Sequence, residues 1–159
     1  MKKSVIIIIG IIYIASIVAI NFFGMKISVY NQKVNVQEIV CLNETNLEKG
    51  INVKDYTDME GNVLGKSIII DYVKPANKNT LQGTILQLEV RVFPDNATNK
   101  KLIYTSSDNE NIEFYTDESG NQTGMILFYG PTRFFYVTIR STDYSNVELT
   151  LQIRAKNVQ

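Results

Sequence analysis

Residues that commonly perform catalysis or bind metals are scarce in this chain. Its 159 residues include no His, which removes the most frequent general base and metal ligand. Cys41 is the single cysteine, so neither an internal disulfide nor a cysteine metal site can form. Lys66 and Ser67 are adjacent, and neighbouring residues of a strand point to opposite faces, so a Ser–Lys nucleophile pair would not meet. We therefore expect no catalytic residues, no cofactor and no enzyme activity.

Three acidic turns are the remaining candidates for a cation site. Clustered carboxylate oxygens suit Ca²⁺. None of the three turns has the EF-hand spacing, in which a glycine occupies the sixth position. Asp and Asn are also ordinary turn formers. We interpret all three as turns without bound metal; they contain Asp58 and Glu60, Asp108 and Glu110, and Asp117 and Glu118.

The charge balance argues against a nucleic-acid partner. Lys and Arg together number 16, and Asp and Glu together also number 16, so the chain carries no overall basic field. Lys is far more frequent than Arg, and Asn and Ile are abundant, which is typical of proteins from AT-rich bacterial genomes. The composition thus favours a bacterial protein that does not bind nucleic acid.

An uncharged apolar run begins at Val5 and ends at Gly24. As a helix, twenty residues span about 30 Å, the thickness of the hydrocarbon core of a bilayer. The alternative is a cleaved signal peptide, whose apolar region usually has about 7 to 15 residues and ends at an A-x-A site. This run is longer and no such site follows it. The sequence therefore predicts an uncleaved, single-pass membrane anchor.

The charges beside this run predict its orientation. Lys2 and Lys3 precede it, and Lys26 stands alone just after it. Positive residues stay on the cytoplasmic side of a membrane helix. We therefore expect the N-terminus inside the bacterial cytoplasmic membrane and the remainder of the chain outside the cytoplasm.

Short strands separated by turns dominate the sequence after residue 66. Apolar and polar residues alternate, as in a strand with one buried face, most cleanly in the last strand, at 146–154, and also from Leu86 to Val92. Pro94 ends this ladder because it has no N–H to donate. About seven short strands in some 90 residues are typical of an Ig-like β-sandwich. We expect strands at 67–73, 84–93, 101–106, 111–115, 125–129, 134–141 and 146–154.

Residues 26–66 have a weaker pattern. Residues 27–30 and 34–42 are predicted as short strands, and residues 43–57 are polar with little periodicity. Two interpretations remain open for this region: a loop-rich stalk, or an extra hairpin added to the sandwich. No stretch after residue 25 has a helical period.

One segment resembles a known family. Residues 92–101, VFPDNATNKK, resemble the V-x-P-x-x-A-T-N-K segment of the bacterial Ig-like domains, group 2. The following LIYTSSD is similar to their v-t-W-S-S-S-D strand, with Tyr104 in place of Trp. The resemblance extends over about residues 67–155. It implies a surface-exposed domain of bacterial adhesins and other cell-envelope proteins, which serves as a spacer or binding module and carries no catalytic residues.

Residues 130–136 depart from this family by being longer and more aromatic than its short G-T-A-x-I segment. If strands 125–129 and 134–141 are neighbours, aromatic side chains are left on the outer face, and such exposed patches mark interaction sites. The alternatives are that residues 26–66 cover these side chains, or that the register differs. The candidate partner-binding patch consists of Tyr129, Arg133, Phe134, Tyr136 and Arg140.

These observations predict an all-β protein, an Ig-like β-sandwich of about seven or more strands preceded by one N-terminal transmembrane helix. We expect a cytoplasmic stub and anchor at 1–25, a stalk or extra strands at 26–66, the sandwich at 67–155 and a tail at 156–159. The expected function is a non-catalytic binding, adhesion or structural module of the cell surface, with a protein or glycan partner. The alternative is an accessory subunit of a membrane complex, whose anchor packs on other transmembrane helices.

Overall fold

The structure, a computed structural model, describes residues 3–30, 33–130 and 132–156, with side chains of the N-terminal helix described for residues 7–22. It divides the chain into two compact units, Met1–Lys33 and Val34–Gln159. We call the second the β unit. Lys2, Pro131 and residues 157–159 of the predicted tail lie outside the described residues, as does the side chain of Lys26.

The described residues of the first unit contain one helix, α1, which spans Lys3–Tyr30. Every described side chain of α1 is exposed. The prediction of a short strand at residues 27–30 is wrong, because the helix continues through them. Extending a helix adds a hydrogen bond for each residue, and this outweighs the weak strand preference of branched residues. Along the stretch with described side chains, no helix combines the length and apolar character needed to cross a membrane.

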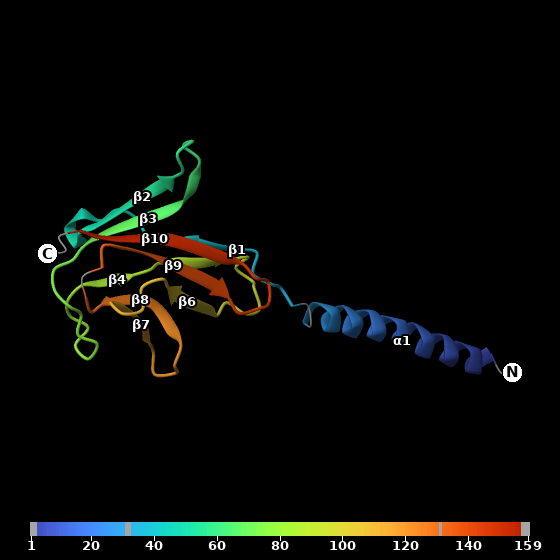
Figure 1. The fold of residues 1–159 in the computed structure, drawn as a ribbon. Helices are drawn as coiled ribbons and strands as arrows, with labels where there is room; N and C mark the ends of the chain where they lie inside the picture. The colour runs from blue at the N-terminus through green and yellow to red at the C-terminus, as the bar shows by residue number, and fades with distance from the viewer. Residues whose placement is uncertain (1–2, 31–32, 131, 157–159) are drawn as a thin grey trace. The chain divides into compact units, whose positions relative to one another are not determined.

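The described residues of the β unit form three sheets (Figure 1). The largest has the order β2-β3-β10-β9-β6, formed by Ile51–Thr57, Val63–Asp71, Glu148–Lys156, Phe134–Ser141 and Leu102–Ser106. The second has the order β4-β8-β7, formed by Ile85–Gln87, Gln122–Phe128 and Ile112–Thr116. The third pairs β1, Glu38–Cys41, with β5, Val90–Phe93. Strands β3 and β10 are parallel, and the other pairs are antiparallel. The described part of this unit is therefore mainly β, as predicted.

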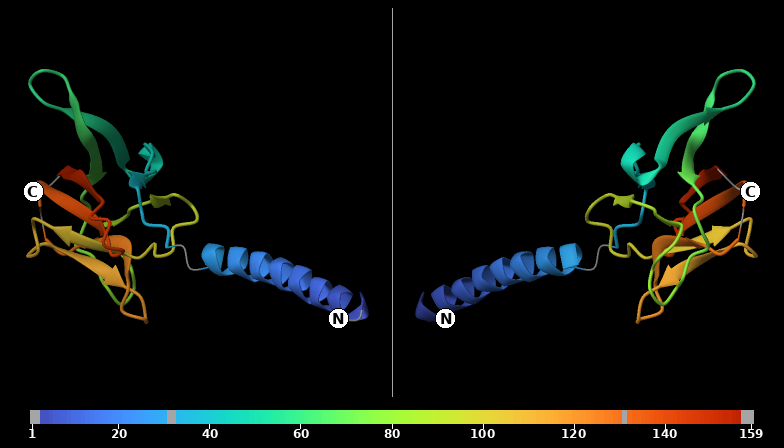
Figure 2. Two further views of the ribbon diagram at one scale, coloured as in Figure 1. Left: turned by 90° about the vertical axis from the view of Figure 1, so that its right-hand side faces the viewer. Right: turned by 90° about the vertical axis from the view of Figure 1, so that its left-hand side faces the viewer.

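The core lies between the three-stranded and five-stranded sheets, which form two layers (Figure 2). The rings of Phe128 from β8 and Phe135 from β9 meet edge to face across it, with centroids 5.8 Å apart. Burying one such side chain contributes about 1.5–3 kcal/mol. The alternating pattern of the strands produces this core directly, because every second residue faces inward. The fully buried set includes Ile68, Leu86, Ile126, Val137, Ile139, Leu151 and Ile153.

Strand positions follow the sequence pattern closely at the C-terminal end and less closely elsewhere. β9 has the predicted bounds, and β6, β7 and β10 lie within two residues of theirs. The predicted strand at 84–93 is two strands instead, because β4 pairs with β8 whereas β5 pairs with β1. The alternation of apolar residues continues through the break, so the pattern alone does not reveal the change of partner.

Residues 34–66 contribute strands to the β unit. β1 and β2 come from this region, and the short 3-10 helix η1, Leu47–Lys49, connects them. β3 begins at Val63 and so crosses the boundary predicted after residue 66. The hairpin of β2 and β3 projects beyond the other strands of the unit (Figure 1). At its tip, Asp58 accepts hydrogen bonds from the backbone N–H groups of Glu60 and Asn62, both at 2.9 Å.

Candidate functional site

The outer face of β9 carries two neighbouring exposed rings. Phe134 is 45% exposed and Tyr136 is 37% exposed, because their positions alternate with the buried Phe135 and Val137. The two rings meet edge to face, with centroids 4.9 Å apart. Exposed aromatic side chains held on a sheet offer large apolar contact area at low entropy cost. We call the outer surface of β9 around Phe134 and Tyr136 the aromatic face.

Guanidinium groups flank the aromatic face. Arg154 of β10 lies opposite Phe134 in the strand register, and its guanidinium carbon is 5.8 Å from the Phe134 ring centroid. The Nε of Arg154 also donates to Gln152 at 3.0 Å, which holds its side chain over the sheet. At the other end of β9, Arg140 forms an ion pair with Glu148. The face therefore combines aromatic, amide and cationic groups on two paired strands.

Tyr129 does not belong to this face, which corrects the predicted patch. β8 and β9 are not neighbours, because they lie in different sheets and meet only across the core. The hydroxyl of Tyr129 donates to Glu113 at 3.1 Å, and Glu113 forms an ion pair with Lys78. Burial, with a smaller contribution from the Glu113 carboxylate, raises the pKa of Tyr129. Tyr129 therefore belongs to a polar cluster with Glu113 and Lys78, which lies at the three-stranded sheet.

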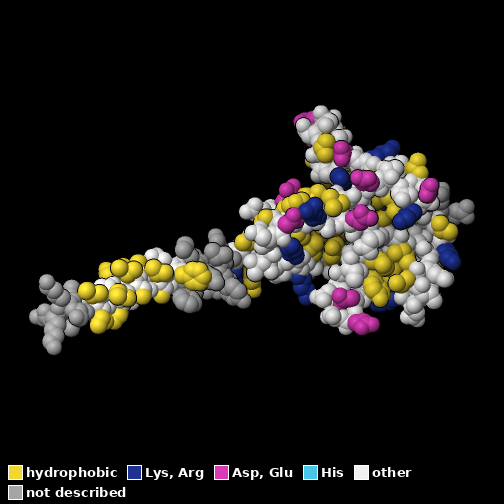
Figure 3. All heavy atoms as spheres, turned by 180° about the vertical axis from the view of Figure 1, so that it is seen from behind, with side chains coloured by type: hydrophobic (Ala, Val, Ile, Leu, Met, Phe, Trp, Pro, Cys, Tyr) yellow, Lys and Arg dark blue, Asp and Glu magenta, His cyan; other side chains and the backbone are white. Residues whose placement is uncertain are grey.

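Arg133 is exposed just before β9, where its carbonyl oxygen accepts a hydrogen bond from the backbone N–H of Ala155 at 3.2 Å. Four of the five predicted residues, Arg133, Phe134, Tyr136 and Arg140, thus follow one another along β9 and its approach. On the face seen in Figure 3, acidic and basic side chains of the β unit are interspersed, so that face has no large field of one sign.

The acidic turns use their carboxylates to fix the turns themselves. Asp117 accepts from the backbone N–H groups of Ser119 and Asn121, at 2.9 and 2.8 Å. Asp108 behaves in the same way: burial alone would raise its pKa, but hydrogen bonds from Thr132 and Asn111 lower it overall. Carboxylates engaged in this manner are the usual reason for Asp in turns.

The Lys66 ammonium donates to the Cys41 carbonyl at 3.1 Å. The hydroxyl of its neighbour Ser67 is buried and has no hydrogen-bond partner among the described residues. Consecutive residues of β3 point to opposite faces of the sheet, so the side chains of Lys66 and Ser67 do not approach each other. The structure offers no Ser–Lys nucleophile at this position.

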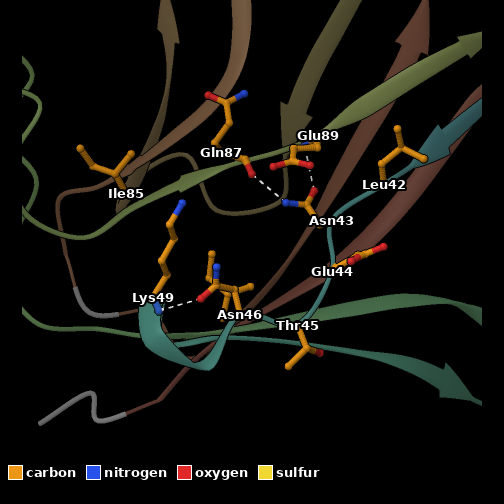
Figure 4. A pocket seen from close by; sticks show the side chains of 10 residues that line it. Leu42, Asn43, Glu44, Thr45, Asn46, Lys49, Ile85, Gln87 and Glu89 are labelled. Atoms are coloured by element: carbon orange, nitrogen blue, oxygen red, sulfur yellow. Dashed lines mark hydrogen bonds between the residues drawn. The ribbon is translucent and has the colours of Figure 1, made fainter.

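A groove that the sequence does not reveal lies beside β4 (Figure 4). It has a volume of about 820 Å³. One wall is β4 with the residues just after it, and the other is the segment that leads from β1 into η1. Lys49 lies toward one end of the groove and Glu44 and Glu89 toward the other. The lining also includes Leu42, Asn43, Thr45, Asn46, Ile51, Ile85 and Gln87.

Asn43 lines this groove and joins its two walls. Its side chain is buried, and Nδ2 donates to the Gln87 carbonyl at 2.8 Å. Its Oδ1 accepts from the backbone N–H of Glu89 at 2.8 Å and from the Cys41 thiol at 3.3 Å. Burial raises the pKa of the Cys41 thiol, which keeps it a hydrogen-bond donor. The Asn43 side chain thus bonds to the Gln87 carbonyl and the Glu89 N–H in place of a paired strand, at the point where β1 ends.

No local sequence signal could have located the groove, because its walls are separated by some 40 residues and meet only through the fold. Comparison with protein-family models and with curated proteins finds no match for this sequence. The resemblance to the bacterial Ig-like domains, group 2, therefore remains an expectation drawn from the residues.

Proposed function

We propose that this protein is a membrane-anchored, non-catalytic binding module of the bacterial cell surface, built on an Ig-like sandwich. The observation that carries the proposal is the aromatic face of β9, where two rings are exposed on a sheet that is firmly held by the core beneath. Aromatic residues with flanking Arg are the side chains most often responsible for binding energy at protein interfaces. The partner is a protein or a glycan.

The strand order supports the Ig-like assignment. An Ig-like sandwich pairs its second, fifth and fourth strands in one sheet and its third, sixth and seventh strands in the other. If β4 and β5 count as the second strand, β6 to β10 follow as the third to seventh. The observed orders β4-β8-β7 and β6-β9-β10 then correspond to the two Ig sheets. β3, paired with β10, then counts as the first strand, and β2 is an addition to that plan.

The proposed anchor rests on α1. Its 28 residues extend for about 42 Å, more than the thickness of a hydrocarbon core. Ser16, a polar residue within the apolar run, donates its hydroxyl to the Ile12 carbonyl at 2.8 Å. Such an internal bond removes most of the cost of a hydroxyl in lipid. With Lys2 and Lys3 on the cytoplasmic side, the β unit is presented outside the cytoplasm.

Photo-crosslinking in intact bacterial cells tests this proposal. A photoreactive amino acid placed at Arg133, beside the aromatic face, should form an adduct with the partner, which mass spectrometry then identifies. The double substitution Phe134→Ser with Tyr136→Ser should abolish that adduct. The control Met59→Ser changes a more exposed apolar residue at the tip of the hairpin and should leave the adduct intact.

An adduct of equal yield in the folded double variant would refute the role of the aromatic face. The same cells distinguish the binding module from the alternative function, an accessory subunit of a membrane complex. In that case a stoichiometric partner co-purifies with the full chain in mild detergent even when both rings are replaced.

A further inference from the structure

β4 is an end strand whose second edge has no partner strand among the described residues. The backbone N–H of Phe128 donates to the Thr84 carbonyl at 3.2 Å, and that of Leu88 donates to the Gly124 carbonyl at 2.9 Å. In an antiparallel ladder, only every second residue exchanges hydrogen bonds with a given neighbour. Thr84 and Leu88, with the residue midway between them, therefore direct their backbone groups toward β8.

Ile85 and Gln87 consequently direct their backbone groups away from β8, into the groove. The Gln87 carbonyl is occupied by Nδ2 of Asn43. Within the described parts of the chain, no partner is found for the N–H of Gln87 or for the N–H and carbonyl of Ile85. Both residues line the groove. Three backbone groups in strand geometry are thus available at its wall.

The chain itself covers only the neighbouring part of this edge. β1 pairs with β5, and the N–H of Leu42 donates to the Glu89 carbonyl at 2.7 Å. The chain then turns away toward the opposite sheet, where Asn46 exchanges backbone hydrogen bonds with Ile51, both at 2.8 Å. The space that a longer β1 would have filled beside β4 is the groove.

The lining defines what fits there. Leu42, Ile51 and Ile85 supply apolar surface, while Lys49 and the pair Glu44 and Glu89 give the two ends of the groove opposite charge. None of these three charged side chains forms an ion pair with another described residue. An extended chain with apolar residues in its middle and opposite charges at its ends complements this arrangement.

We propose that an extended segment of a partner protein binds in this groove by adding as a strand to the free edge of β4. Strand addition of this type gains affinity from main-chain hydrogen bonds and specificity from alternate side chains. The segment carries alternating apolar residues, a basic residue beside Glu44 and Glu89, and an acidic residue beside Lys49. The site is separate from the aromatic face of β9, so its failure would leave the crosslinking test of that face unaffected.

The test uses the full chain in detergent micelles and the synthetic peptide Lys-Thr-Val-Thr-Val-Thr-Glu, with both ends blocked. Amide hydrogen exchange of the free protein should be slow at Leu86 and fast at Ile85 and Gln87. Saturating peptide should slow exchange at Ile85 and Gln87 by at least tenfold. The same peptide with every backbone nitrogen methylated keeps its side chains but has no N–H donor on either edge, so it cannot pair as a strand and should give no protection.

A matched pair of variants isolates one backbone group. Gln87→Ala and Gln87→Pro both lose the side chain, whereas only Gln87→Pro loses the N–H that faces the groove. Gln87→Pro should bind the peptide about three- to tenfold more weakly than Gln87→Ala, the effect of one hydrogen bond. If Gln87→Pro does not fold, Lys49→Glu replaces it: this variant should lose affinity for the peptide and regain it when the peptide's Glu is replaced by Lys.

Several outcomes would overturn the proposal. They are no binding of the peptide at millimolar concentration, protection confined to other strands, or equal binding of the N-methylated peptide. Protection of Ile85 and Gln87 that appears without peptide and increases with protein concentration would assign the groove to a second copy of this chain instead.

Discussion

Replacing Asn43 by Ala should open the junction between β1 and the strand beside it. Asn43 makes two hydrogen bonds of 2.8 Å to the backbone of Gln87 and Glu89. Each such bond contributes about 0.5–1.5 kcal/mol net, so the two together contribute about 1–3 kcal/mol. Because Gln87 and Glu89 are exposed, water can reach the freed backbone groups, and no larger penalty is added. We expect Asn43→Ala to lower the free energy of unfolding by this amount.

The assay is a urea titration of the full chain in micelles, followed by tyrosine near-ultraviolet circular dichroism, since the chain has nine Tyr and no Trp. Asn96→Ala is the control, because Asn96 is exposed and makes no hydrogen bond within the described residues, so its replacement should change stability by less than about 0.5 kcal/mol. Amide exchange at Glu89 should accelerate in Asn43→Ala and stay unchanged in the control.

The variant Asn43→Asp tests the same two hydrogen bonds through the pH dependence of stability. An ionised carboxylate still accepts from the Glu89 N–H but faces the Gln87 carbonyl without a proton to donate. The folded-state pKa of this carboxyl is therefore raised above its unfolded value. The variant should be most stable below the unfolded pKa and lose stability as pH rises through the folded one. A stability of Asn43→Ala within 0.5 kcal/mol of the unmodified chain, or an Asn43→Asp variant with no such pH dependence, would refute this account of the junction.

Two further predictions concern the loops. Gly83 has φ +102°, and an added Cβ would collide with the Pro75 carbonyl, so Gly83→Ala should cost about 3 kcal/mol or more in the same titration. The control Gly120→Ala also requires a positive φ, +76°, but meets no neighbour, and should cost about 1 kcal/mol. Hydrogen bonds from Ser145 and from the backbone N–H of Val36 lower the pKa of Asp143 to about 2. Its contribution to stability should be complete above about pH 4 and disappear as pH falls toward 2, and Asp143→Asn should remove that part of the pH dependence.

The parts of the fold that the sequence predicts are those where local pattern and tertiary environment agree. Along β9 and β10, one face is buried and the other is not, so alternation alone reveals the strands and their inward residues. The same alternation identifies Phe134 and Tyr136 as outward-facing. Sheet partners are a different matter, because pairing depends on contacts between distant segments. The condition that placed Tyr129 on the aromatic patch, adjacency of β8 and β9, is not met for this reason.

Leu127 illustrates the limit in physical terms. Its strand, β8, is apolar on both faces, which suggested an exposed patch. In the structure Leu127 is fully buried although it points away from Phe128 and the main core. Lys78, from the loop between β3 and β4, forms an ion pair with Glu113, which lies opposite Leu127 in the strand register. A strand that is apolar on both faces can therefore have its second face buried under another segment of the chain. The sequence alone does not distinguish this case from an exposed apolar patch.

The parallel pairing of β3 with β10 has a mechanical consequence. After β1 and β2 have detached, a force that separates the ends of the chain acts on β3 at its first residue and on β10 at its last. In parallel strands these points lie at opposite ends of the pair. The two strands would then slide along each other, and all six register pairs from Leu151↔Lys66 to Lys156↔Asp71 would bear the load together. Had the strands been antiparallel, the pairs would have opened one at a time. In a domain held at one end and pulled at the other, these six pairs must break together before the chain between β3 and β10 can extend.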